Sequence, residues 1–289
     1  MLSIHTNYTS LLTQNNLNKT SGAMDQAMQR ISTGFRVNSA ADDAAGLQIA
    51  TRLQSQSNGL SVASRNAQDA TSMLQTAEGA FDEMTNIAHR MKDLATQAAN
   101  GTNSDTEHAA MQAEWDELQL ELNSIVSNTQ YGSGNNLLGA GGLLDGPITF
   151  QIGASTSETM TVNVKPALDD VRAQITTLAS EDLATDAGQA MDAVDALLNG
   201  DRSDADVANH TQGIGEVRSQ LGATINRLDH TVTNLGNMRE NTEMAKGRIM
   251  DTDYAVESSN MMKNQMLTQM SMSMLSQSNG MSGMVMSLI

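Results

Sequence analysis

Residues 60–98 read LSVASRNAQDATSMLQTAEGAFDEMTNIAHRMKDLATQA, and their apolar residues recur at alternating steps of three and four. This spacing is typical of a long helix that packs along one stripe against partner helices. At about 1.5 Å per residue, the predicted helix is on the order of 55–60 Å long. Many stripe positions are Ala, so a partner must approach closely. The positions are Leu60, Ala63, Ala67, Ala70, Leu74, Ala77, Phe81, Met84, Ala88, Met91, Ala95 and Ala98.

Two further helices are predicted to pack on this one. Asn100-Gly101 is a helix stop, and Ser104 with Glu107 forms a capping box that begins the next helix. The short connection predicts an antiparallel hairpin, in which Trp115 is a core anchor rather than a ligand contact. Another helix follows from the spacing of residues 214–235. We expect the core to contain Leu60, Leu74, Phe81, Met84, Trp115, Leu118, Leu122, Leu221, Leu228 and Leu235.

One β element interrupts the helices. Ile148, Phe150 and Ile152 alternate with polar residues, and Met160, Val162 and Val164 do the same after a polar turn. This alternation predicts a hairpin over residues 148–164 that lies against the helices, because an isolated hairpin is marginal in water. Short helices are expected at 169–178 and 188–198, followed by a polar loop or frayed helix at 199–210. The predicted fold class is therefore mainly α.

The composition excludes several classes of protein. The 289 residues carry 16 Lys and Arg against 33 Asp and Glu, a net charge of −17, which argues against a nucleic-acid surface. There is no Cys, so disulfide scaffolds and thiolate metal sites are excluded. The five His are scattered, and Asp251 and Asp253 are more typical of a helix cap than of a metal site. We predict no enzyme, no cofactor and no metal, and we find neither a signal peptide nor an apolar run long enough to span a membrane.

The two ends of the chain resemble each other. Residues 1–24 and 261–289 each contain one formal charge, yet both have helical periodicity. We predict that each end gains order only against other chains, because a methionine stripe on an uncharged helix suits an adaptable interface. A membrane-surface helix would need more Lys, Arg, Trp and Phe, and a solvated helix would leave the stripe exposed. The assembly residues would be Leu11, Met28, Ile31, Met262, Met266, Met270, Met274 and Leu275.

Motifs at both ends then point to a family. The chain closely resembles bacterial flagellin, the subunit of the flagellar filament. The motifs are QRISTG at 29–34, NSAADDAAGL at 38–47, AQDA at 67–70, LQTAEGA at 74–80, NRLD at 226–229, TNLGN at 233–237 and IMDTDYA at 249–255.

The resemblance implies a division of the chain and a set of partners. The termini would pair as a coiled coil lining the inner tube of a secreted, hollow homopolymer, with the rod outside it. The partners would be a flagellin export chaperone at the C-terminal tail, the filament cap, the hook–filament junction proteins and the flagellar type III export apparatus. The implied segments are an inner-tube helix 1–45, rod helices and hairpin 46–165, a short variable segment 166–212, a rod helix 213–252 and an inner-tube helix 253–289.

The resemblance also implies recognition by host immune receptors. Arg90, Leu94 and Glu114 stand where responsive flagellins have the residues read by an animal Toll-like receptor. The alternative is that Arg90 and Glu114 serve contacts between rods in the filament. A plant receptor would read the region of residues 29–46. In the stretch around Arg90 and Leu94, which the animal receptor would read, the sequence departs from the usual flagellin pattern at His89, Lys92, Asp93 and Thr96.

Three other functions are weighed against the filament subunit. They are a hook–filament junction protein, an enzyme grafted on a flagellin frame, and a secreted coiled-coil effector. The nearly absent variable domain predicts a thin, smooth filament. The short, methionine-rich form suggests a lateral rather than a polar one.

Overall fold

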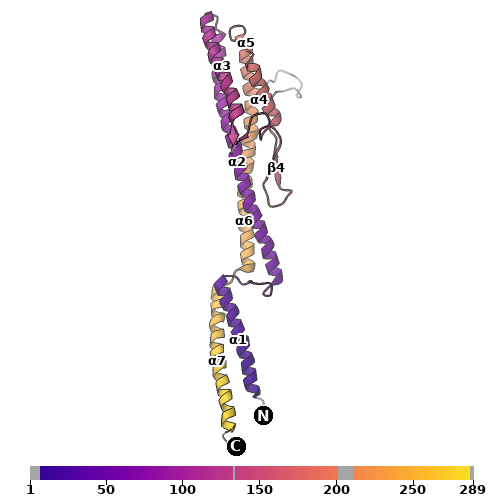
Figure 1. The fold of residues 1–289 in the computed structure, drawn as a ribbon, viewed down its shortest axis with the longest axis vertical. Helices are drawn as coiled ribbons and strands as arrows, with labels where there is room; N and C mark the ends of the chain where they lie inside the picture. Colours follow the sequence, from indigo (N-terminus) through magenta and orange to yellow (C-terminus); the bar gives the residue numbers. More distant parts are fainter. Residues whose placement is uncertain (1–6, 133, 201–210, 287–289) are drawn as a thin grey trace. The chain divides into compact units, whose positions relative to one another are not determined.

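The computed structural model describes residues 7–132, 134–200 and 211–286 and divides into two compact units (Figure 1). One unit comprises residues 1–57 and 240–289, and the other comprises residues 58–239. Helices dominate both units, which confirms the predicted fold class. The elements are α1 (Tyr8–Thr33), α2 (Ala44–Ala98), α3 (Asp105–Asn128), β1 (Gln130–Tyr131), β2 (Asn135–Asn136), β3 (Ile148–Gln151), β4 (Thr159–Val162), α4 (Lys165–Leu178), α5 (Ala187–Asn199), α6 (Ile214–Met250) and α7 (Tyr254–Met286).

The unit of residues 58–239 is a helical bundle built on the stripe of α2. Every stripe position from Leu60 to Ala98 is buried. Helix α3 runs antiparallel to α2, and α6 also runs antiparallel to it, since Arg218 pairs with Asp82 at 2.9 Å whereas Leu235 packs beside Leu60. The other expected core residues, Phe81, Trp115, Leu122, Leu221 and Leu228 among them, are buried as well, and Leu118 is half-buried.

The capping box and Trp115 fix the position of α3. Ser104 donates its backbone N–H to Glu107 Oε2 at 2.7 Å, and this bond and the Ser104 hydroxyl hold the pKa of Glu107 below its usual value. Trp115 Nε1 donates to the carbonyl oxygen of Leu178 at 3.3 Å. The indole is thus a buried anchor between α3 and the end of α4, where its only polar atom has a partner.

Strands β3 and β4 form the predicted hairpin. They pair antiparallel, with Ile148 opposite Val162 and Phe150 opposite Met160. Met160 and Val162 are buried, so the hairpin packs on the bundle by one face. A second, two-residue antiparallel pair, β1 with β2, was not predicted, because its residues show no alternation.

The segment 166–212 contributes more to the bundle than a variable connection would. Val171 and Ile175 of α4 and Val194 and Leu197 of α5 are buried in the common core. The short helices expected at 169–178 and 188–198 lie inside α4 and α5. Of the loop expected at 199–210, positions 201–210 fall outside the described residues. The described residues of α4 and α5 therefore belong to the folded unit.

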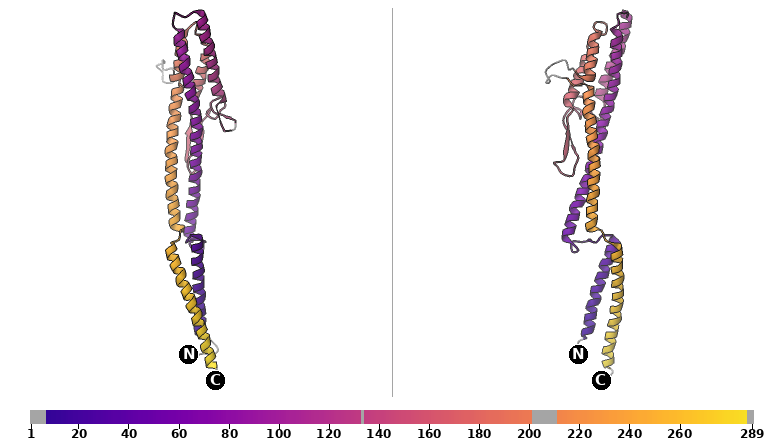
Figure 2. Two further views of the ribbon diagram at one scale, coloured as in Figure 1. Left: turned by 90° about the vertical axis from the view of Figure 1, so that its left-hand side faces the viewer. Right: turned by 180° about the vertical axis from the view of Figure 1, so that it is seen from behind.

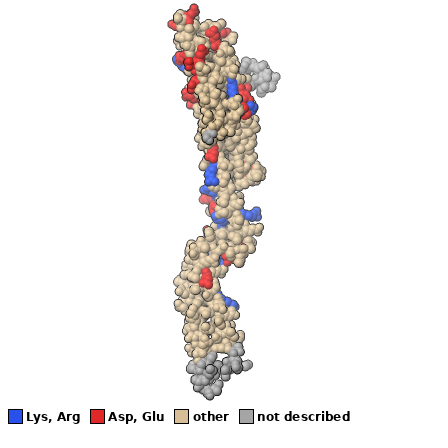
Figure 3. Space-filling view, viewed as in Figure 1, with Lys and Arg blue, Asp and Glu red and all other residues tan. Residues whose placement is uncertain are grey.

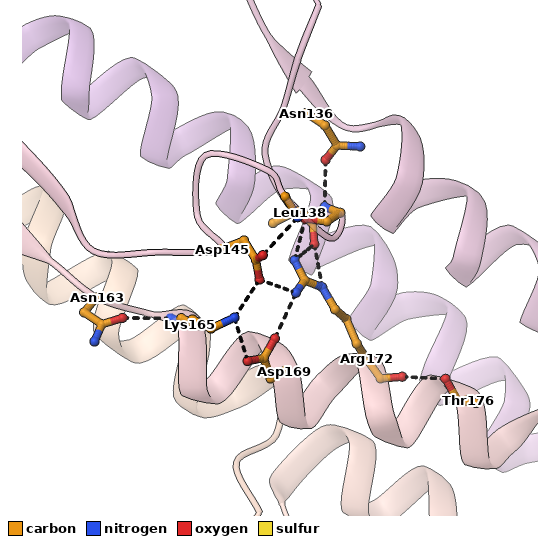
Figure 4. A network of polar contacts seen from close by, with 10 residues as sticks. Asn136, Leu138, Asp145, Asn163, Lys165, Asp169, Arg172 and Thr176 are labelled. Atoms are coloured by element: carbon orange, nitrogen blue, oxygen red, sulfur yellow. Dashed lines mark hydrogen bonds and ion pairs between the residues drawn. The ribbon is translucent and has the colours of Figure 1, made fainter.

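A polar network holds the glycine-rich loop between β2 and β3, residues 137–147, onto α4 (Figure 4). Arg172 donates to Asp145 Oδ1 at 2.8 Å and to the carbonyl oxygens of Leu138 and Gly139. Lys165 Nζ lies 3.0 Å from both Asp145 and Asp169. The Arg172 guanidinium, the Gly141 N–H and Lys165 hold the pKa of Asp145 far below its usual value. The carbonyl oxygens of Leu138 and Gly139 thus accept hydrogen bonds from the Arg172 side chain instead of from a neighbouring strand.

No helix within residues 7–132, 134–200 and 211–286 combines the length and apolarity that crossing a bilayer requires.

Candidate assembly surface

Helices α1 and α7 form an antiparallel pair within the unit of residues 1–57 and 240–289 (Figures 1 and 2). Asn7 Nδ2 donates to the carbonyl oxygen of Ser278 at 3.2 Å near one end of the pair. Arg30 Nη1 lies 2.8 Å from Glu257 Oε1 near the other end. The pairing of the terminal helices, expected from the resemblance, is therefore present within a single chain.

The seam between the two helices is mostly polar or small. Its buried and half-buried side chains recur at steps of three and four on both helices, the coiled-coil spacing. The α1–α7 seam consists of Ser10, Thr13, Leu17, Thr20, Met24, Ala27 and Arg30 on α1, and Glu257, Met261, Asn264, Thr268, Ser271, Leu275 and Ser278 on α7. Such a seam buries little apolar area and contributes little hydrophobic stabilisation.

Most of the large apolar side chains of the pair point away from the seam. Met266 is 62% exposed and Met270 is 65% exposed, although both are fully apolar side chains on well-formed helix. Single exposed apolar residues are ordinary on a surface, but twelve large ones on one helix pair leave apolar area that a further contact can bury. We call this set the outer face: Tyr8, Leu11, Leu12 and Met28 on α1, and Tyr254, Val256, Met262, Met266, Leu267, Met270, Met272 and Met274 on α7.

Most of the assembly residues expected from the sequence lie on the outer face. Leu11, Met28 and the four methionines of the stripe are exposed there. Ile31 and Leu275 are instead half-buried, with Leu275 in the α1–α7 seam. The expected assembly residues left out two outer-face residues on α1, Tyr8 and Leu12, and four on α7: Leu267, Met272, Tyr254 and Val256. Counting steps of three and four from Glu257 through polar residues would have located the seam and left these four outside it.

Charge is scarce on this pair. From Asn264 onward α7 has no charged residue, and α1 has only Lys19 before Asp25. On the face drawn in Figure 3, few charged side chains lie over the pair. A surface that is apolar and nearly uncharged can meet a copy of itself without bringing like charges together.

Caps define where the helices of this unit begin and end. Gly34 ends α1 with φ of +76°, and a Cβ there would meet the Tyr254 hydroxyl at 3.0 Å. Asp253 Oδ1 accepts the Ala255 N–H at 2.9 Å and begins α7, which is the capping role favoured over metal binding. Asp43 Oδ1 likewise accepts the Gly46 N–H at 2.8 Å at the start of α2.

Asp42 organises the turn before α2. Its carboxylate accepts hydrogen bonds from the backbone N–H groups of Ser39 at 2.9 Å and Asn38 at 3.1 Å. It also accepts one from the side-chain amide Nε2 of Gln26 on α1 at 3.0 Å. The Ser39 bond is the main cause of the lowered pKa of Asp42. Residues 38–43 thus form the turn that connects α1 to α2. Within the described residues no cluster suited to hold a metal ion is found.

The expected receptor residues are placed differently from one another. Arg90 Nη2 lies 2.7 Å from Glu114 Oε1, and both side chains are about half exposed, so the pair links α2 to α3 on the surface. Leu94 is only 2% exposed. Leu94 lies one helical turn beyond Arg90, and its side chain is buried in the single chain. A contact of Leu94 with a receptor stays a prediction.

Two family models match the chain. The bacterial flagellin N-terminal helical region matches residues 4–141, and the bacterial flagellin C-terminal helical region matches residues 205–289. The crystal structure of Bacillus cereus flagellin is also similar, with 30% sequence identity, a TM-score of 0.46, and coverage of 59% of this chain and 88% of that chain.

Curated relatives align over almost the whole chain. Polar flagellin F of Vibrio parahaemolyticus is 32% identical and covers 96% of each protein. The flagellin of Halalkalibacterium halodurans is 39% identical, over 88% of this chain and 87% of the relative. The Vibrio alignment spans 366 positions, more than the 289 residues here, so the relative carries insertions that this chain lacks. The chain belongs to the bacterial flagellin family, whose members are non-enzymatic structural subunits that self-polymerise into the extracellular flagellar filament.

Proposed function

We propose that this subunit enters the filament for swimming or swarming motility by burying the outer face of its α1–α7 pair against the outer faces of neighbouring copies. The observation that carries the proposal is the inverted side-chain distribution of the pair. Its seam is mostly polar or small, whereas Leu11, Met266, Met270 and the other residues of the outer face are exposed. A pair arranged in this way is stabilised chiefly when further helices cover it.

Copies of the same chain are the energetically favoured partners for the outer face. Full burial of a Met side chain contributes roughly 1.5–3 kcal/mol, so a few methionines per contact offset much of the cost of association. Met also adapts its shape to an irregular neighbour. The uncharged stretch of α7 from Asn264 removes the repulsion that identical charged helices would suffer. We infer that the ends gain their full order only in the polymer.

The test replaces Met266 and Met270 together by Gln. The double variant keeps side-chain length and helix propensity but removes apolar area, so the critical concentration for growth from filament seeds should rise by about 10-fold or more. Sedimentation of polymer from soluble subunit measures this, and circular dichroism checks that the monomer keeps its helix content.

Leu120→Gln is the matched control. Leu120 of α3 is 58% exposed but lies outside the α1–α7 pair. Its replacement should leave the critical concentration close to that of the unaltered chain. Equal polymerisation of M266Q/M270Q and the unaltered chain would refute the proposal.

The resemblance supports a path to the filament. The exposed apolar face of α7 suits a flagellin export chaperone that covers it before passage through the flagellar type III apparatus, after which the cap and the hook–filament junction proteins direct insertion. The chaperone should bind the full chain and lose most of its affinity for M266Q/M270Q, measured by calorimetry. Unchanged affinity would place its site elsewhere.

A role as ligand of a host Toll-like receptor is proposed from the Arg90–Glu114 surface pair. Both side chains are accessible on adjacent helices. Arg90→Ala and Glu114→Ala should each weaken signalling in receptor-bearing reporter cells, with monomer stability nearly unchanged because exposed ion pairs contribute little. A full response from the double variant would exclude this contact.

A further inference from the structure

We propose that the exposed methionines of α7 are a modification site of the unassembled subunit: oxidation of their thioethers to sulfoxides by a peroxide or a hypohalous acid blocks polymerisation, and enzymatic reduction restores it. The methionine row is defined as Met262, Met266, Met270, Met272 and Met274. This inference rests on the proposed role of the outer face in assembly.

Accessibility separates this row from other methionines of the same chain. Each member of the row is more than half exposed. In the bundle, Met84 and Met91 are completely buried, and Met73, Met111 and Met160 are nearly so. A two-electron oxidant must reach the sulfur, so the row should react first while the buried methionines stay protected by close packing.

The chemistry balances with hydrogen peroxide as oxidant. The thioether sulfur attacks one peroxide oxygen, the O–O bond breaks, and the second oxygen leaves as water after taking up a proton. The sulfur is oxidised by two electrons and the peroxide is reduced by two. The reverse step needs a thiol reductant, which reduces the sulfoxide to the thioether and water and becomes a disulfide. The chain has no Cys, so oxidation cannot be diverted to a thiol.

The consequence follows from the place of the row on the pair. A sulfoxide is polar and accepts hydrogen bonds, so burying it without a donor is unfavourable. None of the five row residues is part of the α1–α7 seam, so their oxidation would leave the seam intact. Oxidation should therefore act on assembly and not on the fold of the single chain. Once the row is covered by neighbouring copies, it should become protected.

The experiment exposes soluble full-length subunit to limited hydrogen peroxide and maps sulfoxides by peptide mass spectrometry. The row should oxidise about 10-fold or more faster than Met84 and Met91. The treated subunit should lose growth on unoxidised seeds, and methionine sulfoxide reductases of both stereospecificities with a thiol reductant should recover it. The same peroxide dose applied to finished polymer should leave the row largely unmodified.

A variant with the five row residues replaced by Leu provides the matched control. It keeps an apolar face without sulfur, so it should still grow after peroxide treatment. Loss of growth in this treated variant would place the effect at other residues and overturn the proposal. If the variant fails to grow untreated, the reductase recovery of the unaltered chain decides the question.

The outcomes separate the two proposals. Failure of M266Q/M270Q to alter growth contradicts the assembly role itself. A subunit whose row is fully oxidised but which polymerises normally contradicts only the modification. Equal oxidation of the row and of the buried methionines also contradicts it, since the site would then have no selectivity.

Discussion

The α1–α7 pair and the bundle of α2, α3 and α6 use the same spacing of three and four, but they fill it with opposite side chains. In the bundle the spaced positions are Leu60, Phe81, Met91 and other apolar residues, all buried. In the pair they include Thr13, Asn264 and Thr268, and most of the large apolar residues lie outside the seam. The spacing determines which residues face a partner helix. The side chains at those positions determine whether the contact buries the apolar surface of the two helices or leaves it exposed.

This difference explains how one chain can contain a unit that is complete and a unit that needs neighbours. The bundle buries its large side chains within the chain, so it should be stable as a monomer. The pair has a weak seam and a large exposed apolar surface, and most of its hydrophobic stabilisation becomes available only between chains. The following changes test that contrast.

The largest effect is expected from a cavity in the bundle. Phe81→Ala removes a fully buried ring and should lower the free energy of unfolding by about 3–5 kcal/mol. Leu11→Ala, on the exposed outer face, should change the same quantity in the monomer by less than about 0.5 kcal/mol. Urea unfolding followed by circular dichroism measures both. Comparable losses would show that the outer face is already covered in the single chain.

Breaking the ion pair in the α1–α7 seam should have the next largest effect. Arg30→Met leaves the buried carboxylate of Glu257 without its partner. We expect about 2–3 kcal/mol less protection of the α1 amides in hydrogen exchange, below the value for a fully buried pair because Arg30 remains a quarter exposed.

The double variant Arg30→Met with Glu257→Leu is the control for that change. It removes both charges and gives the seam two apolar side chains, so protection should return to the original level or exceed it. If the double variant were as weakly protected as the single one, the attraction between Arg30 and Glu257 would itself stabilise the two helices. The loss in the single variant would then not come from the unpaired buried charge.

A smaller, opposite effect is expected from making the seam apolar. Thr13→Val and Thr268→Val exchange hydroxyls that bond only to carbonyls of their own helix, Thr9 and Asn264. Together they should stabilise the pair by about 1 kcal/mol, seen as slower amide exchange in the monomer. Thr51→Val, at an exposed position with the same kind of bond, should have almost no effect.

The smallest effect concerns pH and the loop of the bundle. Because the folded-state pKa of Asp145 lies below the unfolded value of about 3.9, its contribution to stability is complete above that value and disappears as pH falls towards the folded-state pKa. Asp145→Asn should therefore be less stable than the unaltered chain at pH 6, and the difference should shrink near pH 2. A difference independent of pH, measured by thermal unfolding, would contradict the assignment.

The sequence by itself determined the helices, the hairpin and the core of the bundle. The stripe from Leu60 to Ala98 is apolar at every position, so one spacing identifies both helix and buried face. The Ser104–Glu107 capping box is likewise local, because all its bonds form within one turn. Motifs at both ends were specific enough to indicate the flagellin family.

Only the tertiary structure decided which face of the terminal helices meets the partner. The methionine row of α7 is the natural choice for a seam, but the fold gives that place to residues such as Asn264, Thr268 and Ser271 and leaves the row exposed. It also buried Leu94 and brought Asp145 to Arg172. Each outcome depends on contacts between residues far apart in the sequence, and periodicity along a single helix contains no information about which neighbour will occupy which side.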